Sequence, residues 1–162
     1  MNAKLQTPKF FPIPIFFAVV AITLTGCANK MNSMVAPVYQ TKVTPVSSLG
    51  VTGGGASVGV PAFLHRGYKV IEVSNGMSGA VEEARKKSIP FLATIDSVGT
   101  EGSWWDGFFD YAMRVTDTTT GAIVWSATAE YGQGGILINQ VKSSKSAMRD
   151  MVEKFSRYFP PQ

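Results

Sequence analysis

Few side chains in this 162-residue chain have the chemistry of catalysis or metal binding. The chain has one cysteine, Cys27, and one histidine, His65, whereas a zinc site uses about three or four such ligands. Acidic residues that could supply oxygen ligands also occur: Asp96, Glu101, Asp106 and Asp110. Their spacing matches no calcium-binding loop, which favours solvated acids on loops and strand edges. We therefore expect no metal and no cofactor.

A hydrolytic nucleophile is equally hard to find. The nearest match to the Gly-x-Ser-x-Gly pattern of a nucleophile elbow is Gly76-Met-Ser-Gly79, whose second glycine comes one position early. A Ser-His-Asp triad would depend wholly on His65, for which a place in a turn or on the surface is the favoured interpretation. The run Gly53–Gly55 lacks the Gly-Lys-Ser/Thr of a phosphate-binding loop. The sequence therefore predicts a protein that is not an enzyme.

One aromatic-rich segment has the composition of a binding site. Residues 101–109 read Glu-Gly-Ser-Trp-Trp-Asp-Gly-Phe-Phe. Trp104 and Trp105 are adjacent, so in extended backbone their side chains point in opposite directions and one indole is expected to be exposed. Exposed tryptophan is enriched in protein-binding hot spots and at membrane interfaces. We predict that Trp104, Trp105 and Phe108 bind a partner; packing of both indoles over one end of the core is the alternative.

The amino terminus has the layout of an export signal. Lys4 and Lys9 precede a mostly apolar run from Phe10 to Leu24, and no acidic residue precedes that run. The run is shorter than the ~20 apolar residues of a transmembrane helix, and prolines interrupt its first part. The sequence therefore predicts a cleavable signal peptide over residues 1–26.

The apolar run ends in Leu24-Thr25-Gly26-Cys27, which resembles the lipobox of bacterial lipoproteins. In those proteins the cysteine receives diacylglycerol, is exposed by cleavage and is then acylated. Because Cys27 is the only thiol, an exported chain has no internal disulfide to form. The resemblance implies membrane attachment through lipid on Cys27, and Ala28 favours the outer membrane in a host with two membranes. An ordinary signal peptide followed by a chance thiol is the alternative.

The net charge of the whole chain overstates that of its mature part. The chain has 15 basic and 11 acidic residues. Removing the two lysines of residues 1–26 leaves 13 basic residues against 11 acidic ones, a net charge near +2. This balance argues against a nucleic-acid partner.

Residues 28–60 are poor in charged residues and rich in Ser, Thr, Pro and Gly. This composition predicts a lipidated flexible tether over residues 27–60, with an end-to-end distance of about 30 Å. The alternative for Met34–Val38 is an edge strand, where its proline would be tolerated. The remaining residues, 61–162, are enough for one folded domain with a single core.

Apolar periodicity predicts the elements of this domain. The expected elements are strands over 68–73 and 91–96, a short helix over 78–87, a hairpin of strands over 109–116 and 123–130, and an amphipathic helix over 143–159. The strands of the hairpin each have one apolar face, and each helix has one apolar stripe. The expected fold class is α+β, an antiparallel or mixed sheet with both helices packed on one face.

The alternation in the hairpin also predicts its register. The turn lies within Asp117–Gly121, and a loop of three or five residues there would put both apolar faces on the same side of the sheet. The predicted pairs are Val115 with Ile123, Met113 with Trp125, Tyr111 with Ala127, and Phe109 with Ala129.

The hairpin carries the pattern Val-x-Asp-x-x-Thr-Gly-x-x-x-Trp-Ser, with Val115, Asp117, Thr120, Gly121, Trp125 and Ser126 at the named positions. Together with the order strand, helix, strand, hairpin, helix, it resembles a group of periplasmic α/β domains. The group includes those of the curli-secretion lipoprotein, the lipoprotein activators of penicillin-binding proteins and the amino-terminal domain of TolB. The resemblance implies a non-catalytic domain that binds other proteins. The long strands of the curli pore are absent, so pore formation is not implied.

These observations predict a lipid-anchored protein on the periplasmic face of the outer membrane that acts as a non-catalytic accessory or protein-binding module. Its partner would bind the aromatic segment or the exposed face of the hairpin. One alternative, an envelope hydrolase or glycan-binding enzyme, predicts that Asp106→Ala abolishes activity. Another, a purely structural envelope lipoprotein, predicts that replacing Trp104 and Trp105 with alanine changes no co-purifying protein. The sequence determines neither partner identity nor oligomeric state.

Overall fold

The computed structural model describes residues 30–74, 79–99, 108–132 and 144–162. Side chains are described for these residues except 30, 98–99, 108–110, 130–132 and 144. The elements in chain order are β1 (Lys30–Val35), α2 (Pro37–Gln40), β2 (Leu49–Thr52), α3 (Ala56–His65), β3 (Val70–Glu72), α4 (Ala80–Lys86), β4 (Phe91–Gly99), β5 (Phe108–Asp117), β6 (Ile123–Gly132) and α5 (Ser144–Ser156).

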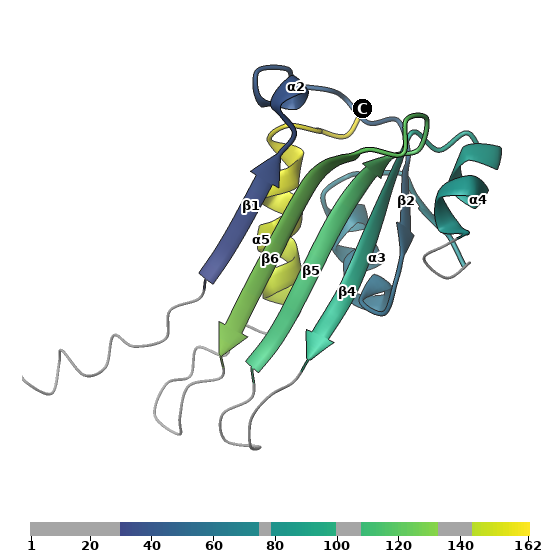
Figure 1. The fold of residues 1–162 in the computed structure, drawn as a ribbon. Helices are drawn as coiled ribbons and strands as arrows, with labels where there is room; N and C mark the ends of the chain where they lie inside the picture. Colours follow the sequence, from purple (N-terminus) through teal and green to yellow (C-terminus); the bar gives the residue numbers. More distant parts are fainter. Residues whose placement is uncertain (1–29, 75–78, 100–107, 133–143) are drawn as a thin grey trace, which may run out of the picture.

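The strands form one mixed sheet in the order β1-β6-β5-β4-β2-β3 (Figure 1). β2 pairs in parallel with β3 and β4, and the other neighbours are antiparallel. The predicted α+β class with a mixed sheet is confirmed. So are the predicted short helix, which is α4, the hairpin, which is β5 and β6, and the carboxy-terminal helix, which is α5.

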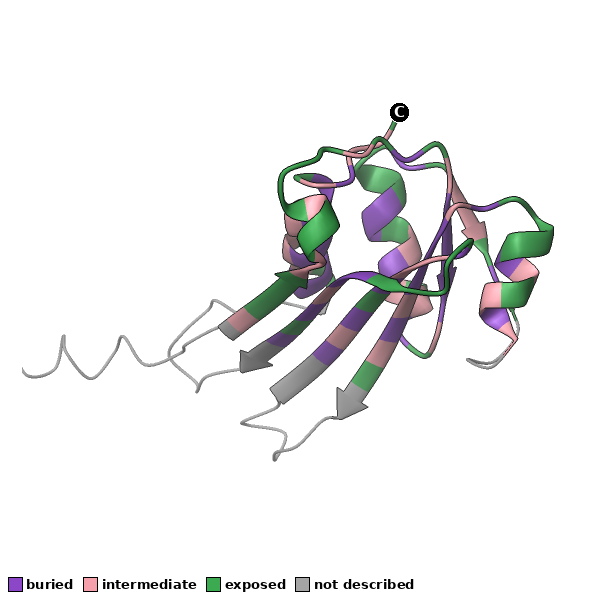
Figure 2. Cartoon of the chain, turned by 45° about the horizontal axis from the view of Figure 1, so that its top comes forward, coloured by how far each residue is buried: buried purple, intermediate pink, exposed green. Residues whose placement is uncertain are grey.

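The main core lies between the sheet and two helices, α3 and α5. Alternate residues of β5 point into it, and Met113 and Val115 are fully buried there. Phe63 of α3 and Phe155 of α5 fill the centre, and Trp125 of β6 packs on Phe155 with ring centroids 5.5 Å apart. Figure 2 shows this alternation as buried and exposed bands along the central strands.

Two helices pack on one face of the sheet, as predicted, but they are not the predicted pair. α3 and α5 share that face, whereas α4 packs in a second cluster with Val73, Ile89 and Leu92. Leu92 points to the face opposite that of its neighbours Phe91 and Ala93. Right-handed crossovers explain the arrangement: α3 leads from β2 outward to β3, and α4 leads back past β2 to β4, so the two helices must lie on opposite faces.

The predicted tether over residues 27–60 is wrong for its described part. Residues 30–60 contain β1, α2, β2 and the first half of α3. β2 lies between β3 and β4, and its Leu49 and Val51 are fully buried, so the folded domain begins near Lys30. The edge-strand alternative for Met34–Val38 is supported for Met34 and Val35, which lie in β1, a strand that pairs only with β6 among the described strands. Pro37 and Val38 lie in α2 instead.

Glycines between β2 and α3 allow this packing. Gly53 has a φ of +98°, and a Cβ atom there would overlap the backbone carbonyl oxygen of Ile95. At Gly55 and Gly59, a Cβ atom would overlap the Ile95 side chain. The glycine-rich composition therefore lets α3 approach β4 closely, and it does not mark a flexible linker.

The hairpin register differs from the prediction by two residues. The structure pairs Val115 with Trp125, Met113 with Ala127, Tyr111 with Ala129, and Phe109 with Tyr131. The Asp117 N–H donates to the Ala122 carbonyl at 2.9 Å, which closes a loop over residues 118–121, and a register shift follows between Val115 and Thr116. The bulge returns the apolar side chains of both strands to the same side of the sheet. As a result Val124 and Trp125 are both buried, and Ile123 is 52% exposed.

The buried Tyr68 hydroxyl connects the start of β3 to the carboxy terminus. It donates to the Phe159 carbonyl at 2.5 Å. Burial raises the pKa of Tyr68 above its ordinary value of 10.0, and the nearby Arg66 opposes that rise. The folded chain therefore favours the neutral phenol, so this contribution to stability is present below pH 10 and is lost as the pH rises further.

We expect Tyr68→Phe to lower the free energy of unfolding at pH 7 by about 1–3 kcal/mol, because the Phe159 carbonyl loses its donor. The variant should also lose less stability than the parent above pH 10, because it has no phenol to ionise. Urea unfolding at neutral pH and at alkaline pH measures both effects. An equal alkaline loss in the two proteins would contradict this role of Tyr68.

Candidate functional site

The sheet face opposite α3 and α5 is uncovered between β1 and β4 among the described residues. Side chains that alternate with the core residues point to this face from four strands. We call the surface the open face and define it by Asn32, Met34, Thr94, Asp96, Ala112, Arg114, Thr116, Ser126 and Thr128. At the far end of the sheet, α4 covers Leu92 on the same side.

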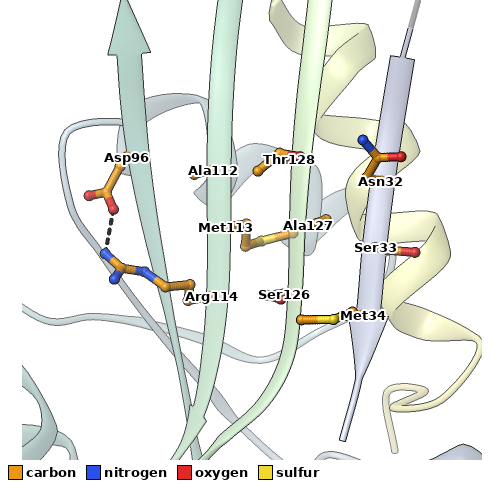
Figure 3. A pocket seen from close by; sticks show the side chains of 10 residues that line it. All are labelled: Asn32, Ser33, Met34, Asp96, Ala112, Met113, Arg114, Ser126, Ala127 and Thr128. Carbon is orange, nitrogen blue, oxygen red and sulfur yellow. Dashed lines mark hydrogen bonds and ion pairs between the residues drawn. The ribbon is translucent and has the colours of Figure 1, made fainter.

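A groove with a volume of about 540 Å³ runs across the open face (Figure 3). β1 forms one wall with Asn32 and Met34, and Asp96 of β4 lies at the other side. The groove has its depth because the floor residues Ala112 of β5 and Ser126 of β6 are small. Met34, which is 74% exposed, leaves a large apolar side chain at the rim.

A second hollow of about 430 Å³ shares Met34, Arg114 and Ser126 with the groove and continues towards Pro37 and Ile123. Ile123 owes its exposure to the bulge in the hairpin. The combined surface therefore has exposed apolar side chains at one end and hydroxyl and amide groups along its length.

One ion pair marks the charged part of the open face. The Arg114 Nη2 atom lies 2.7 Å from the Asp96 Oδ2 atom, and the pair joins β5 to β4 (Figure 3). Both side chains are partly exposed, so the pair contributes at most about 1 kcal/mol to stability. The guanidinium and carboxylate instead give the groove a donor and an acceptor of fixed position, which suits recognition of polar groups.

The acidic residues and the histidine that the structure describes do not gather into a metal site. No group of three or more His, Cys, Asp or Glu among them could hold a metal ion. His65 is exposed at the end of α3, and Asp96 pairs with Arg114. Within the same ranges, no helix has the length and apolar character needed to cross a membrane. Glu101 and Asp106 lie outside the described residues.

Most of the residues predicted from the sequence as functional sites lie outside the part of the chain that the structure describes. Cys27, Trp104 and Trp105 are outside the described residues, and Phe108 is described only as the first backbone position of β5, paired with Gly132. Lipidation and aromatic binding therefore stay predictions.

The exposed face of the hairpin, which carries Arg114, was the second surface predicted to bind a partner, and it is present in the structure. The structure adds Asn32 and Met34 from β1, which sequence reasoning placed in the tether. The available signal was the even spacing of the apolar residues Met31 and Val35, which puts both on one face of a strand, the face that packs against the core.

Known proteins similar to this chain are found by comparing structures and not by comparing sequences. No family model matches the sequence, and no curated protein matches it. A PelC dodecamer from Paraburkholderia phytofirmans aligns with a TM-score of 0.58 at 14% identity, over 77% of this chain and 96% of that chain. A single-residue variant of the same dodecamer gives the same TM-score and coverage at 12% identity. The fold is similar to that of PelC.

The alignment covers nearly the whole PelC chain, so PelC has the same arrangement of helices and strands over most of its length. The carboxy-terminal domain of LpoB from Salmonella enterica aligns with a TM-score of 0.40 at 17% identity, over 56% of this chain and 85% of that chain. That score is too low to support an argument about function or fold.

Proposed function

We propose that this chain is a lipid-anchored protein of the bacterial cell envelope that binds another protein through its open face and catalyses no reaction. The observation that carries the proposal is the groove of about 540 Å³ on an uncovered four-strand surface, with exposed Met34 at its rim and the Arg114–Asp96 pair across it. The groove has no nucleophile paired with a base among the described residues.

The chemistry of the open face fits a protein partner. Protein-binding surfaces combine apolar and polar groups, and Met and Arg are enriched in them. Met34 and Ile123 offer apolar contact, while Arg114, Asp96 and Thr128 offer hydrogen bonds. The small Ala112 and Ser126 leave room for a large side chain of the partner, which is the geometry of a hot-spot pocket.

Attachment to the outer membrane belongs to the same proposal. Its support is the apolar run of residues 10–24 and the segment Leu24-Thr25-Gly26-Cys27. Cys27→Ser is expected to abolish lipid labelling and stable membrane attachment, because serine has no thiol to receive the diacylglycerol and the acyl chains are what anchor the protein. Metabolic labelling with palmitate and membrane fractionation measure this. A labelled, membrane-bound Cys27→Ser protein would refute the anchor.

Thr128→Arg tests the binding surface. Thr128 is exposed on the open face, so an arginine there adds a long charged side chain without entering the core. Burial of this unpaired charge against a partner should weaken binding at least tenfold, which corresponds to about 1.4 kcal/mol. The amount of chemically crosslinked complex in intact cells is the measurement.

Thr119→Arg is the matched control, because Thr119 is also exposed but lies in the turn of the hairpin. It should leave the crosslinked complex unchanged. Equal effects of the two substitutions would show that binding does not depend on the open face.

A second copy of the chain is the other candidate for the partner. The observation in its favour is that the similar PelC structures are dodecamers. Sedimentation of the pure, detergent-extracted protein separates the two cases. If the pure chain assembles and Thr128→Arg dissociates the assembly, the partner is another copy. If the pure chain is a monomer, the partner is a different protein.

A further inference from the structure

The folded domain begins only three residues after the proposed lipid attachment site. β1 starts at Lys30, so Ala28 and Asn29 alone separate it from Cys27. Three residue steps span at most about 10 Å. The end of the sheet where β1 begins must therefore lie at the membrane surface if Cys27 is lipidated. This inference rests on the lipid anchor of the proposed function.

Two contacts, one from β1 and one from α2, show how α5 and the residues after it run relative to β1. The Lys154 Nζ atom contacts the Met31 carbonyl oxygen at 3.5 Å, and the rings of Tyr39 and Phe159 are 5.2 Å apart. β1 and α5 therefore lie side by side and run in the same direction (Figure 1). Lys145 precedes Lys154 by nine positions, or about 13 Å along the helix, so the start of α5 lies at the same end of the domain as the start of β1.

The start of α5 carries an unusual charge distribution. Lys145 and Arg149 are both exposed, and no ion pair joins either of them to another described residue. The first turn of α5 contains no acidic residue. Cations near the positive end of a helix dipole are unfavourable, so this arrangement does not serve helix stability.

These basic residues line a groove with the neighbouring helix. Lys145 and Arg149 of α5 face Ser57 and Pro61 of α3 across a volume of about 310 Å³. We call this surface the basic groove and define it by Ser57, Val58, Pro61, Ala62, Lys145 and Arg149. A cationic groove on α3 and α5, at the end of the domain where β1 begins, is complementary to the phosphate groups of a bilayer.

We propose that the basic groove docks on the anionic lipid surface that holds Cys27. Docking would leave the strands roughly upright on the membrane, so that the open face looks sideways along the membrane surface. The protein would then present its binding surface close to the bilayer instead of at the end of a long tether.

Quenching by spin-labelled lipids tests this orientation in the mature, lipidated chain. Cys27 would be blocked by its lipid, so an introduced cysteine is the only free thiol to carry a fluorophore. The test position is Ser57, which is exposed at the basic groove, and the control is Val38 of α2, which is 73% exposed and lies beyond the far end of β1. In vesicles of phosphatidylglycerol and phosphatidylcholine with nitroxide headgroups, we expect strong quenching at position 57 and little at position 38.

Charge reversal tests the role of the basic groove. Each basic residue near an anionic surface changes the ratio of docked to undocked chains roughly fivefold, which corresponds to about 1 kcal/mol. Lys145→Glu combined with Arg149→Glu should therefore lower that ratio at least about 25-fold and remove the quenching at position 57. Glutamates at the start of α5 suit the helix dipole, so the variant should fold.

Flotation of the vesicles separates the anchor from the docking. Both proteins should float with the lipid, because the acyl chains hold them. Flotation without quenching at position 57, or quenching that survives the charge reversal, would overturn the docking and leave the anchor intact. Failure to float would overturn the anchor and the docking together.

Discussion

Gly53→Ala is expected to lower the free energy of unfolding by more than about 2 kcal/mol. Gly53 has a φ of +98°, which side-chain-bearing residues rarely adopt. An alanine Cβ would also overlap the carbonyl oxygen of Ile95. That oxygen accepts the Gly55 N–H at 2.9 Å, and Ile95 lies in the interior of the sheet, so the backbone there has no room to move away.

Gly54→Ala is the control for this prediction. Its Cβ would meet no atom within 4 Å, and its φ is not positive. The adjacent substitution should therefore be neutral or slightly stabilising, by at most about 1 kcal/mol. Urea unfolding of both variants is the measurement. If the two variants are equally stable, residues 53–55 do not pack against β4, and the flexible tether predicted from the sequence would be the better description of them.

Phe155→Ala should cost about 3–5 kcal/mol, because it removes the side chain at the centre of the main core. The Phe155 ring stacks on Phe159 with centroids 5.0 Å apart and meets Phe63, Tyr68 and Trp125 within 5.9 Å. It therefore joins α3, the segment before β3, β6 and the carboxy terminus. A domain with a stability of about 5–15 kcal/mol would lose a large part of it.

Arg157→Ala is the control in the same segment, since its side chain is largely exposed and pairs only weakly with Glu153 at 3.5 Å. It should change the free energy of unfolding by less than about 0.5 kcal/mol. Chemical unfolding of the two variants gives the difference. A loss below about 1 kcal/mol in Phe155→Ala would mean that α5 does not pack as described.

Periodicity predicted the elements whose burial follows a regular pattern. β5, β6 and α5 each bury alternate or helically spaced residues, so their apolar positions could be recognised in isolation. α3 could not, because Gly59 and Pro61 within it are residues that usually weaken or end helices. β2 could not either, because it has only four residues and all of them are buried, so it shows no alternation. Their place depends on the approach of Ile95, a contact more than thirty positions away that no local pattern contains.

The errors in topology and register have the same origin. Without β2, the crossover that sends α4 to the opposite face could not be deduced. The bulge near Thr116 shifted the hairpin pairs by two residues. It also exposed Ile123, which had been predicted on the apolar face with Trp125, Ala127 and Ala129. For the candidate site, the hairpin face with Arg114 was predictable, whereas Asn32 and Met34 join it only because β1 pairs with β6.

Site-specific photocrosslinking in intact cells tests the central claim, that the open face binds a protein partner. A photoreactive amino acid is placed at position 128 on the open face or at position 119 in the hairpin turn, each replacing an exposed threonine. We predict one discrete crosslinked product from position 128 that position 119 does not give. No product from position 128, or the same products from both positions, would contradict the claim.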